Sequence, residues 1–536
     1  MASLSDKKIN SFCFSEINSF NKDRLSCLII IFFALLGLLF LSIVEPSYLR
    51  FQGFPLDDAW IHAVYGREFA RSGILAYNPG IPATGCTSPL WAIFLAIPHL
   101  ASSSPDITVF LIKIMGFLFH LLTSLTIYFA FRRSDKTSSI FGAALVAIQP
   151  ELIAASVSGM EIPLATFMSS ILILSIQKNP LLFAFSSALV CISRPELTVL
   201  ALLLPILLFP FSRPKLISYS FAGIAGSVFS WSLMMLRNWR ISGLPFPATY
   251  YAKVNSSIWS SFKSFYVGFS QLFPEIAIVN SWLIMVGALI ISLFFLHSRH
   301  SLSEHRMASS FFICGLVYCL VSFYLIPPVD PKAFYHQRYI FPGLPLLIAP
   351  LPVIVASYFR PKLSPTIKKI IFFIFIFLAL LTIIIHAPKR FRHLANDTRN
   401  IDDVQVAIGL FLSRTSPTDT VWVVDAGASR YFGRAFVVDL MGLNNFQLLT
   451  KEANYFLNSH PPSFIEVVPG WNEIDENFVK NLRYKLFKPS TSYTVTSFQP
   501  MQYHFLFFST EKKHKGKIMF KGKSFDFELK PPKLVK

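Results

Sequence analysis

Long apolar runs with few or no charges recur along this sequence, and they constrain its fold more than any other feature. The first, CLIIIFFALLGLLFLSIV, covers residues 27–44, and a helix needs about 20 such residues to cross a bilayer. Charged residues make up only 14% of the chain, against about a quarter in soluble proteins. Further runs lie at about 107–131, 140–157, 160–177, 180–193, 196–211, 217–236, 276–296, 307–326, 339–358 and 370–386. The pattern predicts a polytopic α-helical membrane protein with about 11–13 transmembrane helices.

Basic residues at the ends of these runs predict the orientation. Four precede the first run, which has no small-residue cleavage site behind it and is therefore expected to be a signal anchor. Because Lys and Arg collect in cytoplasmic loops, residues 1–26 are expected to form a cytoplasmic tail and residues 45–88 the first external loop. The short run 89–100 is either a re-entrant half-span or a true crossing. The same distribution of Lys and Arg among the loops places four further stretches on the outer face, at 158–163, 193–196, 237–253 and 327–339.

The composition changes near residue 388. Two short β-rich runs occur within VWVVDAGASRYFGRAFVVDLMGLNN (residues 421–445), and strand-like runs follow at 463–469 and 503–509. The basic tail after residue 510 is expected to form a solvated hairpin or a lipid-facing edge. The sequence therefore predicts a transmembrane catalytic module over residues 27–387 and a small external soluble α/β domain over residues 388–536.

The net charge of +19 raises the question of a nucleic-acid partner. Most of the Lys and Arg, however, lie in short loops or in the C-terminal tail, where they set topology and meet anionic lipid head groups. Membrane lipids, and not nucleic acid, are the expected partners. The six cysteines show no metal-ligand spacing and imply no disulfide framework.

Two adjacent carboxylates, Asp57 and Asp58, lie just beyond the first apolar run. Such a pair can serve as a general base, as metal ligands, or as both. The structural alternative is that Asp57 caps the helix that begins there, with Asp58 in its first turn. Glu161 adds a third carboxylate on the same face, although a Glu at a helix end is often merely interfacial. His62 and His336 are weaker candidates, because a single His is more often structural.

Cations on the outer face are the second unusual feature, since Lys and Arg normally stay on the cytoplasmic side. Arg194, Lys253 and Arg338 lie there, at the edges of apolar runs. They suit a phosphate-bearing ligand, because Arg supplies two parallel charge-assisted contacts. Carboxylates beside a cationic clamp favour a transferase with a phosphate-bearing donor. The alternative is a transporter or flippase of lipid-linked envelope precursors, which would usually show inverted repeats and charges at the midplane.

Six motifs, in sequence order, resemble those of a known superfamily. LDDAWIHAVYGREFARSGILAYNPG…GCTSPLW, SGMEIPL, RPE, SGLPFPATYYAK, RYIFPGLPLL and VVDAG…VVDLMGLNN are similar to motifs of the GT-C polyprenyl-phosphate-sugar-dependent glycosyltransferases. The resemblance covers the chain after about residue 25 and is closest to the branch of the mycobacterial terminal arabinofuranosyltransferase. Thr84 and Cys86 stand where the superfamily has Glu and Tyr, so the sugar specificity cannot be carried over. Ile162, Leu197 and Asn445 also depart from the motifs.

The resemblance implies a GT-C fold and an inverting transfer, with Asp57 or, preferably, Asp58 as the general base. The polyprenyl-phosphate-linked sugar donor would enter from the bilayer. The acceptor would be a cell-envelope glycan, lipid or protein on the periplasmic side of a bacterial inner membrane. A divalent metal, Mg²⁺ or Mn²⁺, could be held by Asp58 and Glu161. The residues expected to bind donor phosphate or substrate are Glu161, Arg194, Tyr250, Lys253, His336 and Arg338.

Overall fold

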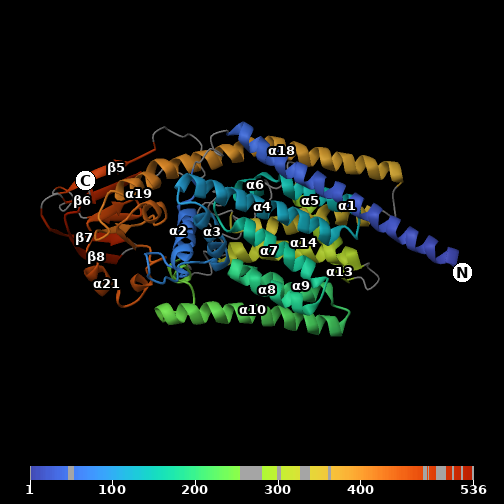
Figure 1. Cartoon of the computed structure of the whole chain (residues 1–536), viewed down its shortest axis with the longest axis horizontal. Coiled ribbons are helices and arrows are strands. Elements are labelled where there is room, and N and C mark those ends of the chain that lie inside the picture. The colour runs from blue at the N-terminus through green and yellow to red at the C-terminus, as the bar shows by residue number, and fades with distance from the viewer. Residues whose placement is uncertain are drawn as a thin grey trace.

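The protein is a helical bundle with a small sheet domain at one end, and its N-terminus lies at the opposite end (Figure 1). The computed structural model describes residues 2–45, 53–253, 281–297, 303–325, 338–359, 364–474, 480, 482–489, 503–509, 512–520 and 523–533. The fold class expected from the sequence, a polytopic helical membrane protein with a small C-terminal α/β domain, is confirmed.

Four helices in the described ranges are long and apolar enough to cross a membrane. Two of these spans are parts of longer helices, which continue beyond the apolar stretch. The spans are Asp23–Val44 of α1 (Ala2–Val44), α4 (Pro105–Phe131), α10 (Arg213–Ser242) and His305–Ser322 of α14 (Ser303–Leu325). Their lengths follow from the bilayer, because each residue of a helix adds only about 1.5 Å.

A fifth span is bent. α5 (Lys136–Ile148) and α6 (Pro150–Ser156) meet at 56° and qualify as one span only when taken together. The bend has a local cause: Pro150 disfavours the helical conformation at the residue before it, and Gln149 has ψ 121. The continuous run 140–157 that the sequence suggested is therefore two helices.

The remaining apolar helices each have fewer than 18 described residues. α3 (Pro89–Ala101) has 13 residues and a length of about 20 Å, which agrees better with a half-span than with a full crossing. The others are α7 (Ile162–Ile176), α8 (Pro180–Ser193), α9 (Thr198–Leu208), α13 (Ser281–His297), α16 (Leu344–Ile348) and α17 (Pro350–Phe359).

One long helix, α18 (Pro365–Ile401), joins the bundle to the sheet domain (Figure 1). It runs through position 388, where the sequence placed the start of the external domain, and continues into the π-helix Asp402–Val406 and α19 (Ala407–Leu412). The two parts of the molecule are thus connected by continuous helix and not by an extended linker.

The C-terminal domain contains two sheets. β1 (Thr420–Val423) lies parallel to β2 (Phe436–Asp439) and β3 (Phe464–Val467), while β6 (His504–Phe508) is antiparallel to β3 and to β5 (Arg483–Phe487). The five-stranded order is β2-β1-β3-β6-β5. The second sheet has the order β4-β7-β8, from β4 (Asn472–Ile474), β7 (His514–Phe520) and β8 (Lys523–Leu529). The four strands and the C-terminal hairpin expected from the sequence are all present.

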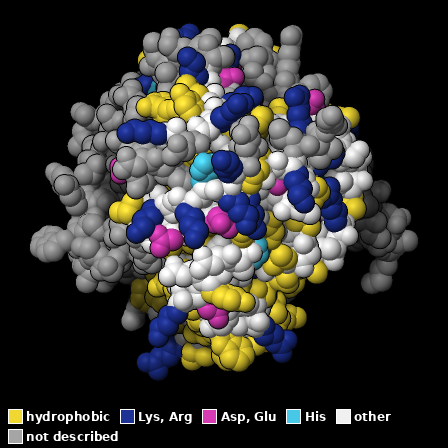
Figure 2. Space-filling view, turned by 90° about the vertical axis from the view of Figure 1, so that its left-hand side faces the viewer, with side chains coloured by type: hydrophobic (Ala, Val, Ile, Leu, Met, Phe, Trp, Pro, Cys, Tyr) yellow, Lys and Arg dark blue, Asp and Glu magenta, His cyan; other side chains and the backbone are white. Residues whose placement is uncertain are grey.

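The surface of this domain is strongly basic. Lys and Arg side chains are scattered over the face that looks away from the bundle, with few acidic groups between them (Figure 2). The exposed Lys517 and Lys513 of the C-terminal hairpin pair with Asp526 and Glu528. Pairs as exposed as these contribute little to stability.

Each end of the bundle carries its own charge cluster. At the end near the N-terminus, Asp23 accepts hydrogen bonds from Tyr128 at 2.7 Å and Lys136 at 2.9 Å, and it pairs with Arg132. Asp23, near the end of the tail, therefore lies beside the loop at 132–136, and both were expected in the cytoplasm. At the other end, the first loop, the motifs around Glu161 and Arg194, and Arg338 meet beside the sheet domain. The shared face inferred from the basic loops is thus a real cluster.

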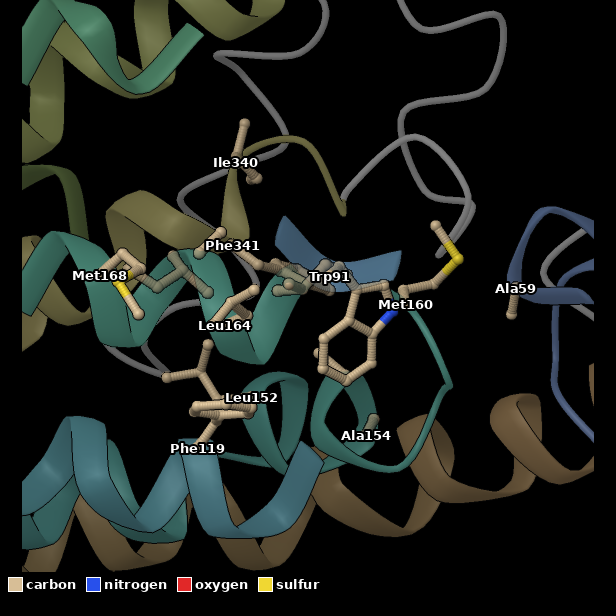
Figure 3. Close-up of a cluster of buried hydrophobic side chains, with 14 of the residues drawn as sticks. Ala59, Trp91, Phe119, Leu152, Ala154, Met160, Leu164, Met168, Ile340 and Phe341 are labelled. Carbon is tan, nitrogen blue, oxygen red and sulfur yellow. The ribbon is translucent and has the colours of Figure 1, made fainter. Parts of the chain in front are cut away.

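A buried aromatic core supports that second cluster. Trp91 donates a hydrogen bond to Gly159 O at 3.0 Å, and its ring lies among Met160, Leu164 and Phe341 (Figure 3). These apolar residues flank the polar ones in the chain, since Met160 precedes Glu161. The core therefore fixes the backbone from which the charged side chains project.

Candidate active site

Four segments that are distant in the sequence meet at the end of the bundle nearest the sheet domain. They are the start of α2 (Asp57–Ser72), the loop before α7, the link between α8 and η2 (Pro195–Leu197), and the stretch before η3 (Phe341–Gly343). Gly159 shapes the second segment, with φ +77 and the ring of Phe54 only 2.6 Å from where a Cβ would lie. Only glycine fits there without displacement.

Asp58 and Arg338 form the centre of the site. Arg338 Nη2 lies 2.6 Å from Asp58 Oδ2, and the same nitrogen donates to the Tyr339 hydroxyl at 3.0 Å. The guanidinium also lies over the Tyr339 ring and donates to Met160 Sδ at 3.8 Å. Arg338 is 3% exposed, whereas the Asp58 side chain is 22% exposed. A buried cation therefore holds a carboxylate that can still be reached from outside.

Glu161 sits between two cationic groups. Its Oε2 lies 3.2 Å from His62 Nε2, and its Oε1 lies 3.2 Å from Arg194 Nη1. Burial alone would raise the pKa of Glu161, but the charges of Arg194 and His62 hold it well below the ordinary range. The carboxylate is thus ionised at neutral pH, and it keeps both cations in place.

Arg194 is fixed on three sides. Its Nε donates to Glu196 Oε1 at 2.7 Å, its Nη1 faces Glu161, and its guanidinium lies over the Tyr339 ring at 5.1 Å. The side chain is 5% exposed. Through Tyr339, which contacts both arginines, the Glu161 cluster and the Asp58–Arg338 pair form one network.

His62 is part of this network and not an isolated core histidine. Burial lowers its pKa, but Cys86 and Glu161 beside it more than offset that effect and raise the pKa to about 9. An imidazolium is therefore present at neutral pH. Cys86, one of the positions that depart from the superfamily motif, is one of its neighbours.

Asp57 has a different role from Asp58. The N-cap of α2 is Leu56, with no side-chain cap hydrogen bond, so Asp57 does not cap its own helix. Its two oxygens instead accept from the backbone N–H groups of Gly427 at 2.6 Å and Ala428 at 2.8 Å, which begin α20 (Ala428–Phe432). Burial and the charge of Asp425 raise the pKa of Asp57, while the two N–H donors oppose the rise. Asp57 therefore fastens the first loop to the sheet domain.

The sheet domain contributes a polar group that the sequence reading did not single out. Asp425 follows β1, and Gln405 Nε2 donates to its Oδ2 at 2.8 Å. His504 Nε2 lies 3.8 Å from the same oxygen, and His504 Nδ1 lies 2.8 Å from the buried Glu466. Burial raises the pKa of Asp425 to about 6, although the His504 charge lowers it. The signal was available, because functional groups collect at the carboxyl ends of parallel strands.

The other expected residues are only partly described. Tyr250 lies in α11 (Ala248–Lys253), is 46% exposed, and contacts the rings of Phe246 and Tyr251. This helix is tied to the first loop by a hydrogen bond from Ala248 N to Thr84 O at 3.2 Å. Lys253 ends α11, but its side chain lies outside the described residues, as does the whole of His336.

The described residues do not fit a divalent metal ion. No group of three His, Cys, Asp or Glu within the described ranges is arranged to hold one. Asp58 and Glu161, the expected ligands, each already face a guanidinium. We therefore derive no chemical step through a metal, and the Mg²⁺ or Mn²⁺ site stays an untested prediction.

Comparison with solved structures identifies the fold. ArnT from Cupriavidus metallidurans bound to undecaprenyl phosphate aligns with a TM-score of 0.55 and 11% identity, over 88% of this chain and 97% of that one. The chain therefore shares the fold of that ArnT structure. The apo state of the same protein aligns with a TM-score of 0.52, the same identity and the same coverage. A family model described as a domain of unknown function, DUF8728, matches residues 399–513. No curated protein matches the chain in sequence.

Proposed function

We propose that this protein is a membrane glycosyltransferase that moves a sugar from a polyprenyl-phosphate donor to a cell-envelope acceptor on the outer face. Its GT-C fold supports the proposal, since the similar ArnT structure is bound to undecaprenyl phosphate. The motif resemblance adds the arabinofuranosyltransferase branch as the nearest group. The chain would lie in a bacterial inner membrane, with its site and sheet domain on the periplasmic side.

The observation that carries the proposal is the pairing of Asp58 with Arg338. A general base must be reachable by the acceptor hydroxyl, and Asp58 is partly exposed while Asp57 is occupied by two backbone N–H groups. Arg338 orients the carboxylate and places a positive charge beside it. Base and anion-binding group thus lie within 2.6 Å of each other at the end of the bundle.

The proposed reaction follows from these positions. The acceptor hydroxyl transfers its proton to Asp58, and its oxygen attacks the anomeric carbon of the donor sugar. The bond from that carbon to the phosphate oxygen breaks, so polyprenyl phosphate leaves with the electron pair and the configuration inverts. Arg338 stabilises the charge that develops on the leaving phosphate. Glu161 holds the positive groups His62 and Arg194 in position.

Tyr250, Lys253 and His336 belong to the proposal as donor-binding residues. Lys253 and Tyr250 lie on α11, which is hydrogen-bonded to the first loop at Thr84. Lys253, the one cation of that helix, would suit a donor phosphate that approaches from the bilayer. Their assignment rests on the motif resemblance.

The decisive experiment uses the full-length protein in membranes or liposomes. Labelled polyprenyl-phospho-sugars are supplied, and free polyprenyl phosphate and labelled acceptor are measured over time. We expect both to appear together with the native protein and not with Asp58→Asn. Movement of intact donor across the bilayer without cleavage would instead support the transporter or flippase alternative and refute the transferase.

A further inference from the structure

A cavity of about 300 Å³ lies between the first external loop and the sheet domain. One wall is formed by residues 77–83 of the loop, and the other by the start of β2, residues 444–447 and α21 (Ala453–Ser459). Asp58, Glu161, Arg194 and Arg338 are not among its lining residues. It is therefore separate from the charged site described above.

Two hydrogen bonds connect this cavity to the site. Tyr77, which lines it, donates from its hydroxyl to Ala426 O at 2.5 Å, next to the Gly427 amide that holds Asp57. Asn444, on the opposite wall, accepts from the Tyr65 hydroxyl at 3.0 Å on the helix that carries Asp58. A molecule in the cavity would thus rest against the same scaffold that positions the proposed base.

The lining of the cavity is aromatic and includes one buried polar atom without a hydrogen-bond partner among the described residues. The rings of Phe436 and His460 stack at 4.8 Å, and Tyr455 extends an aromatic side chain that is 78% exposed. The buried Oε1 of Gln447 has no hydrogen-bond partner among the described residues. Because buried polar atoms are normally paired, this acceptor is available to a donor group on a ligand.

The charge of the lining narrows the class of ligand. Among the described residues that line the cavity there is no Lys or Arg, and Glu452 contributes a carboxylate. A phosphate or another anion would meet no cation among these described residues, unlike at Arg338. Small-molecule pockets commonly combine apolar walls with a few directed polar groups, and a sugar ring matches that combination. Its C–H face packs on an aromatic ring while its hydroxyls donate to carboxylate and amide oxygens.

We propose that this cavity binds a neutral saccharide unit of the acceptor. The inference rests on the proposed transferase function and adds the chemical class of the acceptor to it. The donor phosphate would bind at the Asp58–Arg338 pair, whereas the acceptor would bind in the cavity between the first loop and the sheet domain. The saccharide would be held at a distance from the reacting hydroxyl, so the cavity would govern which glycan is extended.

The test measures saccharide binding by the full-length protein in nanodiscs on an array of neutral and anionic oligosaccharides. Two variants alter the cavity, Tyr455→Ala at an exposed ring and Gln447→Ala at the unpaired amide. The matched control is Tyr484→Ala on β5, an exposed tyrosine outside the cavity. We expect neutral saccharides to bind, and each cavity variant to weaken binding about tenfold, as truncation of a contact anchor does. The control should bind like the native protein.

Two results would overturn the proposal: no binding of any neutral saccharide, or equal binding by the native protein and both cavity variants. Preference for anionic oligosaccharides would also refute it, because the described part of the lining carries a carboxylate and no cation. Failure of the proposed function is recognised separately by the donor assay. A protein that binds saccharides through Tyr455 but never cleaves a polyprenyl-phospho-sugar would retain the cavity assignment and lose the transferase.

Discussion

The carboxylates of Asp57 and Asp58 are adjacent in the chain but face different partners. Asp57 accepts from the N–H groups of Gly427 and Ala428, and Asp58 pairs with Arg338 at 2.6 Å. Neighbouring residues of a helix point about 100° apart, so one turn of α2 can join the sheet domain and also supply the site. This division of roles makes the two positions separable by mutation.

Asp58→Asn should abolish transfer and leave the fold intact. Loss of a positioned general base typically lowers the rate by about 10²–10⁴, while Asn preserves the size of the side chain. Sugar transfer at matched protein level measures the effect, with Asp106→Asn, an exposed carboxylate in the first turn of α4, as the control. Near-normal transfer by Asp58→Asn would remove Asp58 from the reaction.

Asp57→Asn should mainly destabilise the junction with the sheet domain. Asn offers one oxygen and one NH₂ group, so one of the two backbone N–H groups would face another donor. An unsatisfied buried group costs about 1–3 kcal/mol. Thermal unfolding and limited proteolysis between the bundle and the sheet domain would report the loss. An unchanged unfolding temperature with abolished transfer would instead make Asp57 the base.

Arg338→Gln should raise the donor concentration needed for half-maximal transfer by roughly ten- to a hundredfold, because a charge-assisted contact contributes about 1.5–3 kcal/mol. The apparent KM for the donor is the measurement. Lys253→Gln is expected to act in the same direction if its ammonium also meets the phosphate. Arg240→Gln, an exposed cation near the end of α10, is the control. Unchanged donor dependence in Arg338→Gln would reduce that arginine to a structural partner of Asp58.

The charge of His62 should make stability fall at high pH. Its pKa is raised to about 9 in the folded protein, above the ordinary value of about 6.5. The stabilisation is therefore fully present below about pH 6.5 and is lost as the pH rises through about 9, with an upper bound of about 3 kcal/mol. Unfolding temperatures of the native protein and His62→Gln, compared from pH 6 to pH 10, should converge at the alkaline end. A constant difference between them would show that His62 does not titrate in this range.

Topology can be tested with truncated reporter fusions. The contact of Asp23 with Lys136 places the tail and the loop at 132–136 at one end of the bundle, and the Asp57–Gly427 contact places the first loop and the sheet domain at the other. Fusions after residues 250 and 400 should report an external location, and a fusion after residue 134 a cytoplasmic one. A cytoplasmic signal after residue 400 would contradict the proposed orientation.

Much of the architecture could be read from local patterns. VWVV and FVVD are β-branched runs bounded by glycine-containing turns, and they became β1 and β2. The apolar runs became helices because a helix forms all of its backbone hydrogen bonds within the same segment. The break at Pro150 and the continuation of α18 past residue 388 were missed, since hydropathy averages over a bend and does not detect a polar helix that extends beyond the membrane.

The site could be predicted only as a set of residue types. The assignment of Lys- and Arg-rich loops to the cytoplasm predicted that Glu161, Arg194 and Arg338 share the opposite face. The structure joins these three residues in one network. No local pattern distinguishes Asp57 from Asp58, because their partners are hundreds of residues away. His504 was missed for the same reason, since only the sheet brings β6 beside β3 and its buried Glu466. Asp425 could have been found from its position at the end of a parallel strand.

The unbroken path of α18 into the sheet domain sets the height and the rotation of that domain above the bilayer. Each residue of a helix advances the axis by about 1.5 Å and turns it by about 100°. One inserted residue between the membrane and Asp402 would therefore swing Gly427 and Ala428 away from Asp57. Two whole turns would restore the direction but lift the domain by about 11 Å. The length of this partly buried helix therefore matters to the site as much as the side chains that it carries.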